Sequence, residues 1–312
     1  MNTIIGFLHL VRVKNLGFVI LAQLLLRYFV IEPRLGPYAF VDKLSEGNFL
    51  LLVLSTVLIT AAGYIINDYF DVGIDSVNKP KKIVIGKIIH RRTAMTLHLI
   101  FNFLGIALGF YLGWKLNNYK LGYFHFMVAG LLWFYSTSFK RTLFLGNLIV
   151  SILTSLVIMI VVFYEPRLYS NLSQYSTDAS KTILRIILAY AYFAFMVSMI
   201  REIVKDTEDV EGDAELDCRT IPVVFGIKWA KIVSAGFTFI VIGSLGYIQV
   251  LLIKDELLVQ LTYLLITVQL PLIYVLYLLR QAQTKDDFHK ISYMIKLTMF
   301  TGLTSMIFFY QS

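Results

Sequence analysis

The chain has 312 residues, of which 58% are hydrophobic and only 15% are charged, and its mean hydropathy is +0.73. One soluble core of this length cannot bury so much apolar side chain, so the composition excludes soluble enzymes and nucleic-acid-binding modules and predicts an integral membrane protein. Lysine and arginine exceed aspartate and glutamate by 28 to 20, and we expect this positive excess to face lipid headgroups.

Nine apolar segments are each long enough to cross the hydrocarbon layer as a helix. They are expected at residues 16–32, 49–66, 94–114, 121–137, 146–164, 182–200, 232–252, 257–279 and 291–310. Their runs are continuously apolar and do not alternate, which argues against membrane strands. We therefore predict an all-α fold, a bundle of nine transmembrane helices forming a single domain over residues 1–312.

Lysine and arginine are concentrated in the loops on the amino-terminal side of this topology. The positive-inside rule then places the amino terminus in the cytoplasm. The expected location is the inner (plasma) membrane of the cell, with two acidic loops, 67–92 and 201–226, on its cytoplasmic side.

These two loops carry the same spacing of aspartates, D-x-x-D-x-x-x-D. The first copy is Asp68, Asp71 and Asp75, and the second is Asp206, Asp209 and Asp213. The chain therefore contains an internal repeat. On a helix, positions i, i+3 and i+7 share one face, so each copy predicts an acidic stripe, which Asn67 and Glu202 extend.

Three carboxylates on one face repel each other, and a charge buried in a membrane is costly, so the two stripes predict bound cations. Oxygen ligands favour Mg²⁺, which uses few protein carboxylates and completes its shell with water and substrate phosphate. The predicted ligands are Asn67, Asp68, Asp71, Asp75, Asp206, Asp209 and Asp213. The alternative is a pair of solvated acidic helix ends, which would need no repeated spacing.

Both copies resemble signatures of the UbiA superfamily of intramembrane prenyltransferases. NDYFDVGIDSVNKP at 67–80 resembles the first signature and KDTEDVEGD at 205–213 the second. RVKN at 12–15 resembles the R-P-x-N element without its proline, YSTSFKRTLFLGN at 135–147 resembles the Y-S-x-x-x-K-R segment with its following G-N, and CRTIPVVFG at 218–226 resembles the stretch after the second signature. The run from Arg201 to Pro222 is most similar to the geranylgeranylglyceryl phosphate synthase-like branch.

The resemblance implies Mg²⁺-dependent transfer of a prenyl group from a polyprenyl diphosphate to a lipid-soluble acceptor, in a central cavity opening near the cytoplasmic face. It implies substrate contacts from Arg12, Lys14, Asn15, Tyr64, Lys81, Tyr135, Ser136, Lys140, Arg141, Asn147, Arg201 and Lys205. Within this set, five basic residues are expected to neutralise the diphosphate, namely Lys81, Lys140, Arg141, Arg201 and Lys205. Lys81 stands where many members carry arginine, which removes a bidentate contact.

Aromatic rings near the motifs offer cation–π stabilisation to the allylic cation, and Tyr64 and Tyr135 are the candidates; their alternative role is in the interfacial aromatic belt. Arg12, Lys14 and Lys82 are candidates for holding an acceptor phosphate, or else they are ordinary positive-inside anchors.

Two alternative functions remain open from the sequence. The acceptor could be aromatic, as in quinone, haem or chlorophyll biosynthesis, instead of a (geranylgeranyl)glyceryl phosphate. The chain could instead be a cation transporter, although both acidic clusters lie on the same side of the membrane, unlike typical inverted repeats.

Overall fold

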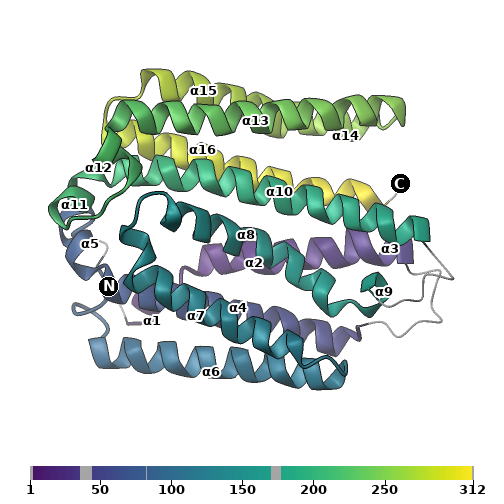
Figure 1. Ribbon diagram of the computed structural model, residues 1–312, viewed down its shortest axis with the longest axis horizontal. Helices are drawn as coiled ribbons and strands as arrows, with labels where there is room; N and C mark the ends of the chain where they lie inside the picture. Colours follow the sequence, from purple (N-terminus) through teal and green to yellow (C-terminus); the bar gives the residue numbers. More distant parts are fainter. Residues whose placement is uncertain (1–2, 36–43, 82, 170–176, 311–312) are drawn as a thin grey trace. The chain divides into compact units, whose positions relative to one another are not determined.

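The computed structural model describes residues 3–35, 44–81, 83–169 and 177–310, and within these ranges every regular element is helical apart from one isolated bridge between Ile85 and Ile89 (Figure 1). The elements are α1 (Thr3–Leu10), α2 (Val13–Leu25), the π-helix η1 (Leu26–Ile31), α3 (Glu32–Leu35), α4 (Glu46–Phe70), α5 (Val72–Asn78), α6 (Arg91–Lys115), α7 (Lys120–Thr137), the 3₁₀ turn η2 (Phe139–Arg141), α8 (Leu145–Tyr164), α9 (Pro166–Tyr169), α10 (Thr177–Glu208), α11 (Val210–Glu215), α12 (Ile221–Phe225), α13 (Ile227–Lys254), α14 (Leu258–Leu264), the π-helix η3 (Leu265–Gln269), α15 (Leu270–Gln281), α16 (Lys285–Thr304) and the 3₁₀ segment η4 (Ser305–Tyr310). The all-α prediction is confirmed.

Among the described residues, eight helical segments are long and apolar enough to cross a membrane. They are Val13–Leu35, Glu46–Phe70, Arg91–Lys115, Leu145–Tyr164, Ala179–Glu208, Ile227–Lys254, Leu258–Gln281 and Lys285–Tyr310. The ninth expected crossing, 121–137, is the helix α7, which carries Lys120 and His125 and is not one of these eight segments. The chain is an integral, multi-pass membrane protein.

By its internal contacts the chain divides into two compact units, each assembled from separated segments. Unit 1 contains residues 1–24, 35–140 and 157–184, and unit 2 contains residues 25–34, 141–156 and 185–312.

In unit 1, helices α4, α6 and α7 pack against each other through small residues. The Ser55 hydroxyl of α4 donates a hydrogen bond to the Gly105 carbonyl of α6 at 2.7 Å. A Cβ added at Gly105 would lie 2.6 Å from a carbon of Ile59, so the absence of a side chain allows this approach. A separate apolar cluster joins the end of α1, the middle of α4 and the start of α6, with Leu10, Val11 and Ile65 at its centre.

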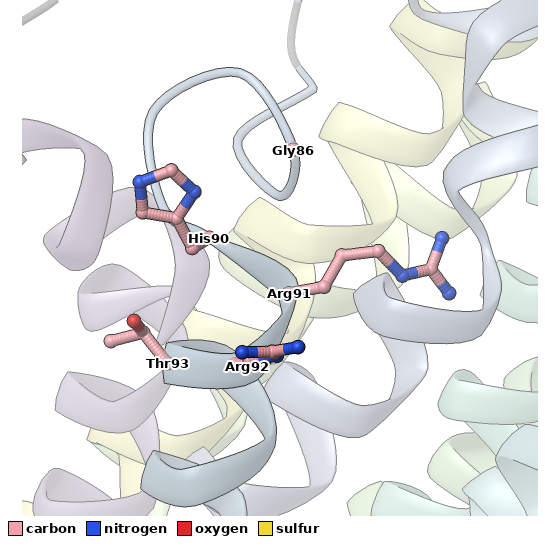
Figure 2. A pocket seen from close by; sticks show the side chains of 5 residues that line it. All are labelled: Gly86, His90, Arg91, Arg92 and Thr93. Carbon is pink, nitrogen blue, oxygen red and sulfur yellow. The ribbon is translucent and has the colours of Figure 1, made fainter.

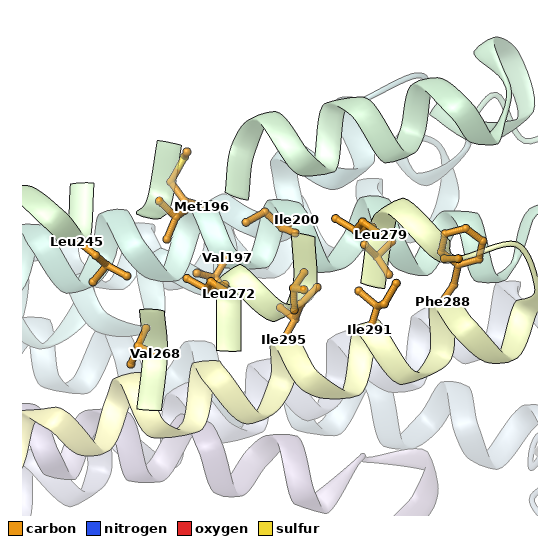
Figure 3. Packing of buried hydrophobic residues seen from close by; sticks show 14 residues of the cluster. Met196, Val197, Ile200, Leu245, Val268, Leu272, Leu279, Phe288, Ile291 and Ile295 are labelled. Carbon is orange, nitrogen blue, oxygen red and sulfur yellow. The ribbon is translucent and has the colours of Figure 1, made fainter. Parts of the chain in front are cut away.

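One apolar core of unit 2 joins α10, α13, α15 and α16 (Figure 3). Ile200, Leu272 and Ile295 are fully buried there. Unit 2 also contains an intramembrane charge: Arg27, in the π-helix η1, is fully buried and forms an ion pair with Glu32 at 3.1 Å. Charged groups are tolerated inside a membrane when they are paired in this way.

Candidate active site

Both aspartate motifs lie at a break between two helices, and the break falls at the same place in each copy. Helix α4 ends just before Asp71 and α5 begins after it, and α10 and α11 flank Asp209 in the same way. The backbone angles are similar, with φ −86° and ψ −2° at Asp71 and φ −99° and ψ 10° at Asp209. Each acidic motif is therefore divided between two helices that meet at its central aspartate.

The chemistry of aspartate explains the breaks. Aspartate is a poor residue for a helix interior and a good one for a helix start, and glycines at 73 and 212 weaken the helix that follows. The backbone N–H of Asp71 still donates to the Asn67 carbonyl, and that of Asp75 to the Asp71 carbonyl, so the polar backbone is satisfied across the turn.

In the first motif, Arg12 forms an ion pair with Asp68, with the guanidinium nitrogen 2.7 Å from the carboxylate. Arg12 joins α1 to α2 in a left-handed conformation, φ 51°, and its guanidinium lies 4.9 Å from the centre of the Tyr64 ring. The apolar cluster of unit 1 brings α1 and α4 together on either side of this contact. The Tyr64 ring face proposed for an allylic cation is therefore covered by Arg12.

Asp71 is the most buried carboxylate of the first motif and receives two donors on the same oxygen. Lys140, from the turn η2, forms an ion pair with its Oδ2, and the Asn67 side-chain amide donates to that atom at 2.7 Å. The sequence predicted Asn67, Asp71 and Lys140 as site residues, and the structure brings them together.

Asp75 completes the first motif from α5. Burial raises the pKa of its carboxyl group above the ordinary value, and the charges of Asp71 and Asp68 raise it further, while Lys79 and Lys140 partly offset this effect. The contributions of Asp71 and Asp68 to this pKa show that the three carboxylates lie close enough to repel one another. A site of this kind favours an additional cation.

The second motif is held by different partners. The side-chain amide of Asn147, near the start of α8, donates to Asp206 at 2.7 Å. An apolar cluster of Met199, Ile203 and Ile221, with Leu148 packed against it, brings α8 and α10 together beside this contact. The neutral amide of Asn147 thus contacts the first aspartate of the second copy, whereas the charged guanidinium of Arg12 contacts the first aspartate of the first copy.

Basic residues of the second copy contact an additional carboxylate. Arg201 donates to Glu202 at 2.8 Å, and the Lys205 ammonium lies 3.8 Å from the other oxygen of Glu202. The buried Asp213 accepts a long hydrogen bond, 3.4 Å, from the Thr220 hydroxyl, and its carbonyl accepts from the backbone N–H of Cys218.

Sequence reasoning missed two side chains that contact this region. Thr220 contacts Asp213, and His289 of α16 lies 2.9 Å from the buried Glu208, which precedes Asp209. Thr220 lies in the matched stretch after the second signature, which was the available signal. His289 is remote in sequence, and only the packing of α16 against α10 reveals it.

Among the remaining predicted residues, Lys14, Lys81 and Arg141 are exposed, and Asn15 and Tyr135 are half-buried. Ser136 is buried and donates to the Leu132 carbonyl within its own helix. Lys82 lies outside the described residues.

A pocket of about 570 Å³ lies at the start of α6, lined by Gly86, His90, Arg91, Arg92 and Thr93 (Figure 2). His90 and Arg91 point away from each other, and the Arg91 guanidinium lies 4.4 Å from the centre of the Tyr69 ring. Its basic side chains do not converge on one point, and its lining differs from the set of predicted site residues.

The donor atoms of the first motif are compatible with a hard cation. In the described part of the chain, no group of three histidine, cysteine, aspartate or glutamate side chains is already arranged as a metal site. However, the side-chain oxygen of Asn67 is buried and has no hydrogen-bond partner, and it belongs to the residue that contacts Asp71. A buried carbonyl oxygen beside carboxylates suits Mg²⁺.

Comparison with known proteins identifies the family. The model of the UbiA prenyltransferase family matches residues 37–301. The chain belongs to this family. Its relatives include the digeranylgeranylglyceryl phosphate synthases of Thermococcus gammatolerans, 30% identical over 88% of this chain and 90% of that protein, and of Methanococcoides burtonii, 30% identical over 96% of this chain and 98% of that protein.

Solved UbiA-family structures have the same fold. The structure of a digeranylgeranylglyceryl phosphate synthase aligns with a TM-score of 0.62 at 21% identity, over 98% of this chain and 99% of that chain. A UbiA homologue of Archaeoglobus fulgidus, bound to GPP and Mg²⁺, aligns with a TM-score of 0.58 at 17% identity, over 96% of this chain and 99% of that chain. The family membership makes this chain a prenyltransferase with a UbiA-type helical fold.

Proposed function

We propose that this UbiA-family prenyltransferase transfers a geranylgeranyl group from its diphosphate to the free hydroxyl of geranylgeranylglyceryl phosphate. The observation that carries the proposal is that relatives aligned over most of the chain are named digeranylgeranylglyceryl phosphate synthases. The carbon–oxygen bond of the donor breaks, pyrophosphate leaves with the bonding electrons, and the acceptor oxygen forms an ether and loses its proton.

Mg²⁺ is the proposed cofactor, because the donor atoms of the first motif suit a hard cation and an A. fulgidus homologue binds GPP with Mg²⁺. The proposed ligands are Asn67, Asp68, Asp71 and Asp75 in the first copy and Asp206, Asp209 and Asp213 in the second. When bound, the metal neutralises the diphosphate and makes pyrophosphate a better leaving group.

The residues of the chain itself have separate proposed tasks. Arg12 fixes Asp68, Asn147 fixes Asp206, and Asn67 fixes Asp71. The basic residues proposed to contact the diphosphate are Lys81, Lys140, Arg141, Arg201 and Lys205. Asn15, Tyr135 and Ser136 are proposed to line the substrate site, where apolar surroundings keep water from the allylic cation.

We also propose a domain organisation and a membrane topology for the chain. We propose that residues 1–312 act as one prenyltransferase domain, and the positive-inside bias supports a cytoplasmic amino terminus. Topology can be checked in a Cys218→Ser background. An impermeant maleimide added to intact cells should label Tyr119→Cys, and should label Ser76→Cys only after lysis.

The deciding experiment is an acceptor screen. Purified protein in detergent receives labelled geranylgeranyl diphosphate, Mg²⁺ and one acceptor, either geranylgeranylglyceryl phosphate, a hydroxybenzoate or a dihydroxynaphthoate. We expect a labelled ether only with the glyceryl phosphate. Prenylation of an aromatic acceptor alone would reject the proposed acceptor and leave prenyl transfer intact.

A further inference from the structure

The ion pair between Lys140 and Asp71 places a cation of the chain on a proposed metal ligand. Lys140 contacts Oδ2 of Asp71, and the Asn67 amide donates to the same oxygen. Two donors thus occupy this oxygen, and the Asp71 side chain is only 7% exposed. A divalent cation that coordinates Oδ2 must therefore displace the ammonium group.

The neighbouring ion pair is built differently. Arg12 contacts Asp68 from a left-handed backbone position, and its guanidinium lies over the Tyr64 ring, so both backbone and side chain are fixed by several contacts. A guanidinium is also planar and rigid, whereas a lysine ammonium is a single point charge on a flexible stem. Of the two cations, Lys140 is therefore the one whose side chain can change its position.

The position of Lys140 supports this view. It lies in η2, a single 3₁₀ turn between α7 and α8, and is followed by the exposed residues Arg141 and Thr142. Its own side chain is 22% exposed. The ammonium can leave Asp71 by rotation of its side chain, without any change in the packing of α4.

We propose that Lys140 is a tethered cation that competes with Mg²⁺ for Asp71, so that binding of the metal releases its ammonium group for the diphosphate. The proposal rests on the proposed function for the identity of that anion. Lys140 thereby couples the two binding steps: metal binding is opposed by the ion pair, and diphosphate binding compensates by giving the released ammonium a new partner. The coupling is reciprocal, since each ligand strengthens binding of the other by the same factor.

The test is a measurement of Mg²⁺ binding by calorimetry, with purified full-length protein in detergent and with no diphosphate present. Lys140→Met removes the charge and keeps the length of the side chain. It should bind Mg²⁺ about tenfold more tightly than the wild type, because a charge-assisted hydrogen bond to a buried carboxylate no longer has to be broken. Lys140→Gln is the second variant, in case the first does not fold.

Three controls separate the local competition from a general change in charge. Lys87→Met removes an exposed positive charge and should alter the affinity by less than about twofold, because exposed charges are screened by salt. Lys140→Arg keeps the charge and should not gain affinity. Adding Asp71→Asn to Lys140→Met should abolish the gain.

Unchanged or weaker Mg²⁺ binding in Lys140→Met and Lys140→Gln would overturn the proposal, as would an equal gain in Lys87→Met. The proposed function fails separately. If Lys140→Met binds Mg²⁺ more tightly but the wild type prenylates no acceptor, the competition by Lys140 is supported and the proposed function is rejected. If the wild type transfers the prenyl group but Lys140→Met binds Mg²⁺ no more tightly, the proposed function is supported and the competition is rejected.

Discussion

Asp71 and Asp213 are the two carboxylates of the acidic motifs that are buried, with 5% and 6% of their surface exposed. Changing either residue to alanine removes a proposed metal ligand, so we expect the rate of transfer to fall by at least about a thousandfold. The measurement is initial rate with saturating donor and acceptor, together with size-exclusion chromatography to show that the variant is folded. Asp255→Ala, at the end of α13, is the matched control and should keep its activity. Near-normal turnover in both motif variants would exclude a two-site metal arrangement.

Asp75 provides a test through pH. Its pKa in the folded protein is raised above the ordinary value, so the charged carboxylate destabilises the fold at neutral pH, and this cost is lost as the pH falls through the raised pKa. We expect Asp75→Asn to melt at a higher temperature than the wild type at pH 7 without Mg²⁺. The difference should vanish below the ordinary aspartate pKa, where both side chains are neutral.

Added Mg²⁺ should narrow the same difference, because the metal binds the wild-type carboxylate and stabilises the folded state. A variant that melts at or below the wild-type temperature at pH 7 would contradict the destabilisation of the charged Asp75 carboxylate by burial and by its two neighbours.

At the scale of residues, the sequence predicted which side chains gather and could not predict how they pair. The repeated spacing and the family signatures were enough to select Asp68, Asp71 and Lys140. They did not show that Arg12 would cover Tyr64, because that contact depends on a left-handed backbone angle between two helices. Pairings of this kind depend on three-dimensional packing.

Helix packing in unit 1 depends on the absence of a side chain at Gly105. Gly105→Ala would place a methyl group 2.6 Å from Ile59 and 3.2 Å from the Ser55 carbonyl, so we expect a loss of about 1–3 kcal/mol of stability. Thermal melting in detergent measures it.

Gly130→Ala is the control for that substitution. Gly130 lies in α7, in the same unit, and an added Cβ meets no atom within 4 Å. Replacing a helical glycine at an open position removes backbone entropy from the unfolded chain and should stabilise the protein by up to about 1 kcal/mol. If both variants melted at the same temperature, the close approach of α4 and α6 would be disproved.

At the scale of elements, the sequence predicted the helices correctly where long apolar runs dominate. Eight of the nine expected segments are helices that meet the length and composition of a membrane crossing, and the ninth, α7, is a helix at the expected place. The turns at Asp71 and Asp209 escaped prediction because helical spacing continues through them. A local change in ψ redirects a chain without altering the pattern of residues.

For the whole molecule, the main functional question is the acceptor. Arg12 and Lys14 were both expected to hold an acceptor phosphate, but Arg12 contacts Asp68 whereas Lys14 is exposed. We expect Lys14→Gln to raise the apparent KM for geranylgeranylglyceryl phosphate about tenfold, because the variant loses one charge-assisted contact. The apparent KM for the donor should not change.

Arg12→Gln should instead raise the apparent KM for donor and acceptor together, because it also releases Asp68. Steady-state kinetics with each substrate varied in turn separate the two cases. An unchanged acceptor KM in Lys14→Gln would mean that this lysine does not contact the acceptor and only anchors the protein at the membrane surface.

The segments of the two units alternate along the chain, and this order has a consequence for synthesis of the protein. All segments of unit 1 have been translated once residue 184 is made, whereas residues 25–34 and 141–156 must wait for their partners in 185–312. Asn147 therefore enters the membrane before Asp206 exists. The charge of Arg27 does not have to wait, because Glu32 belongs to the same short segment and neutralises it from the moment of insertion.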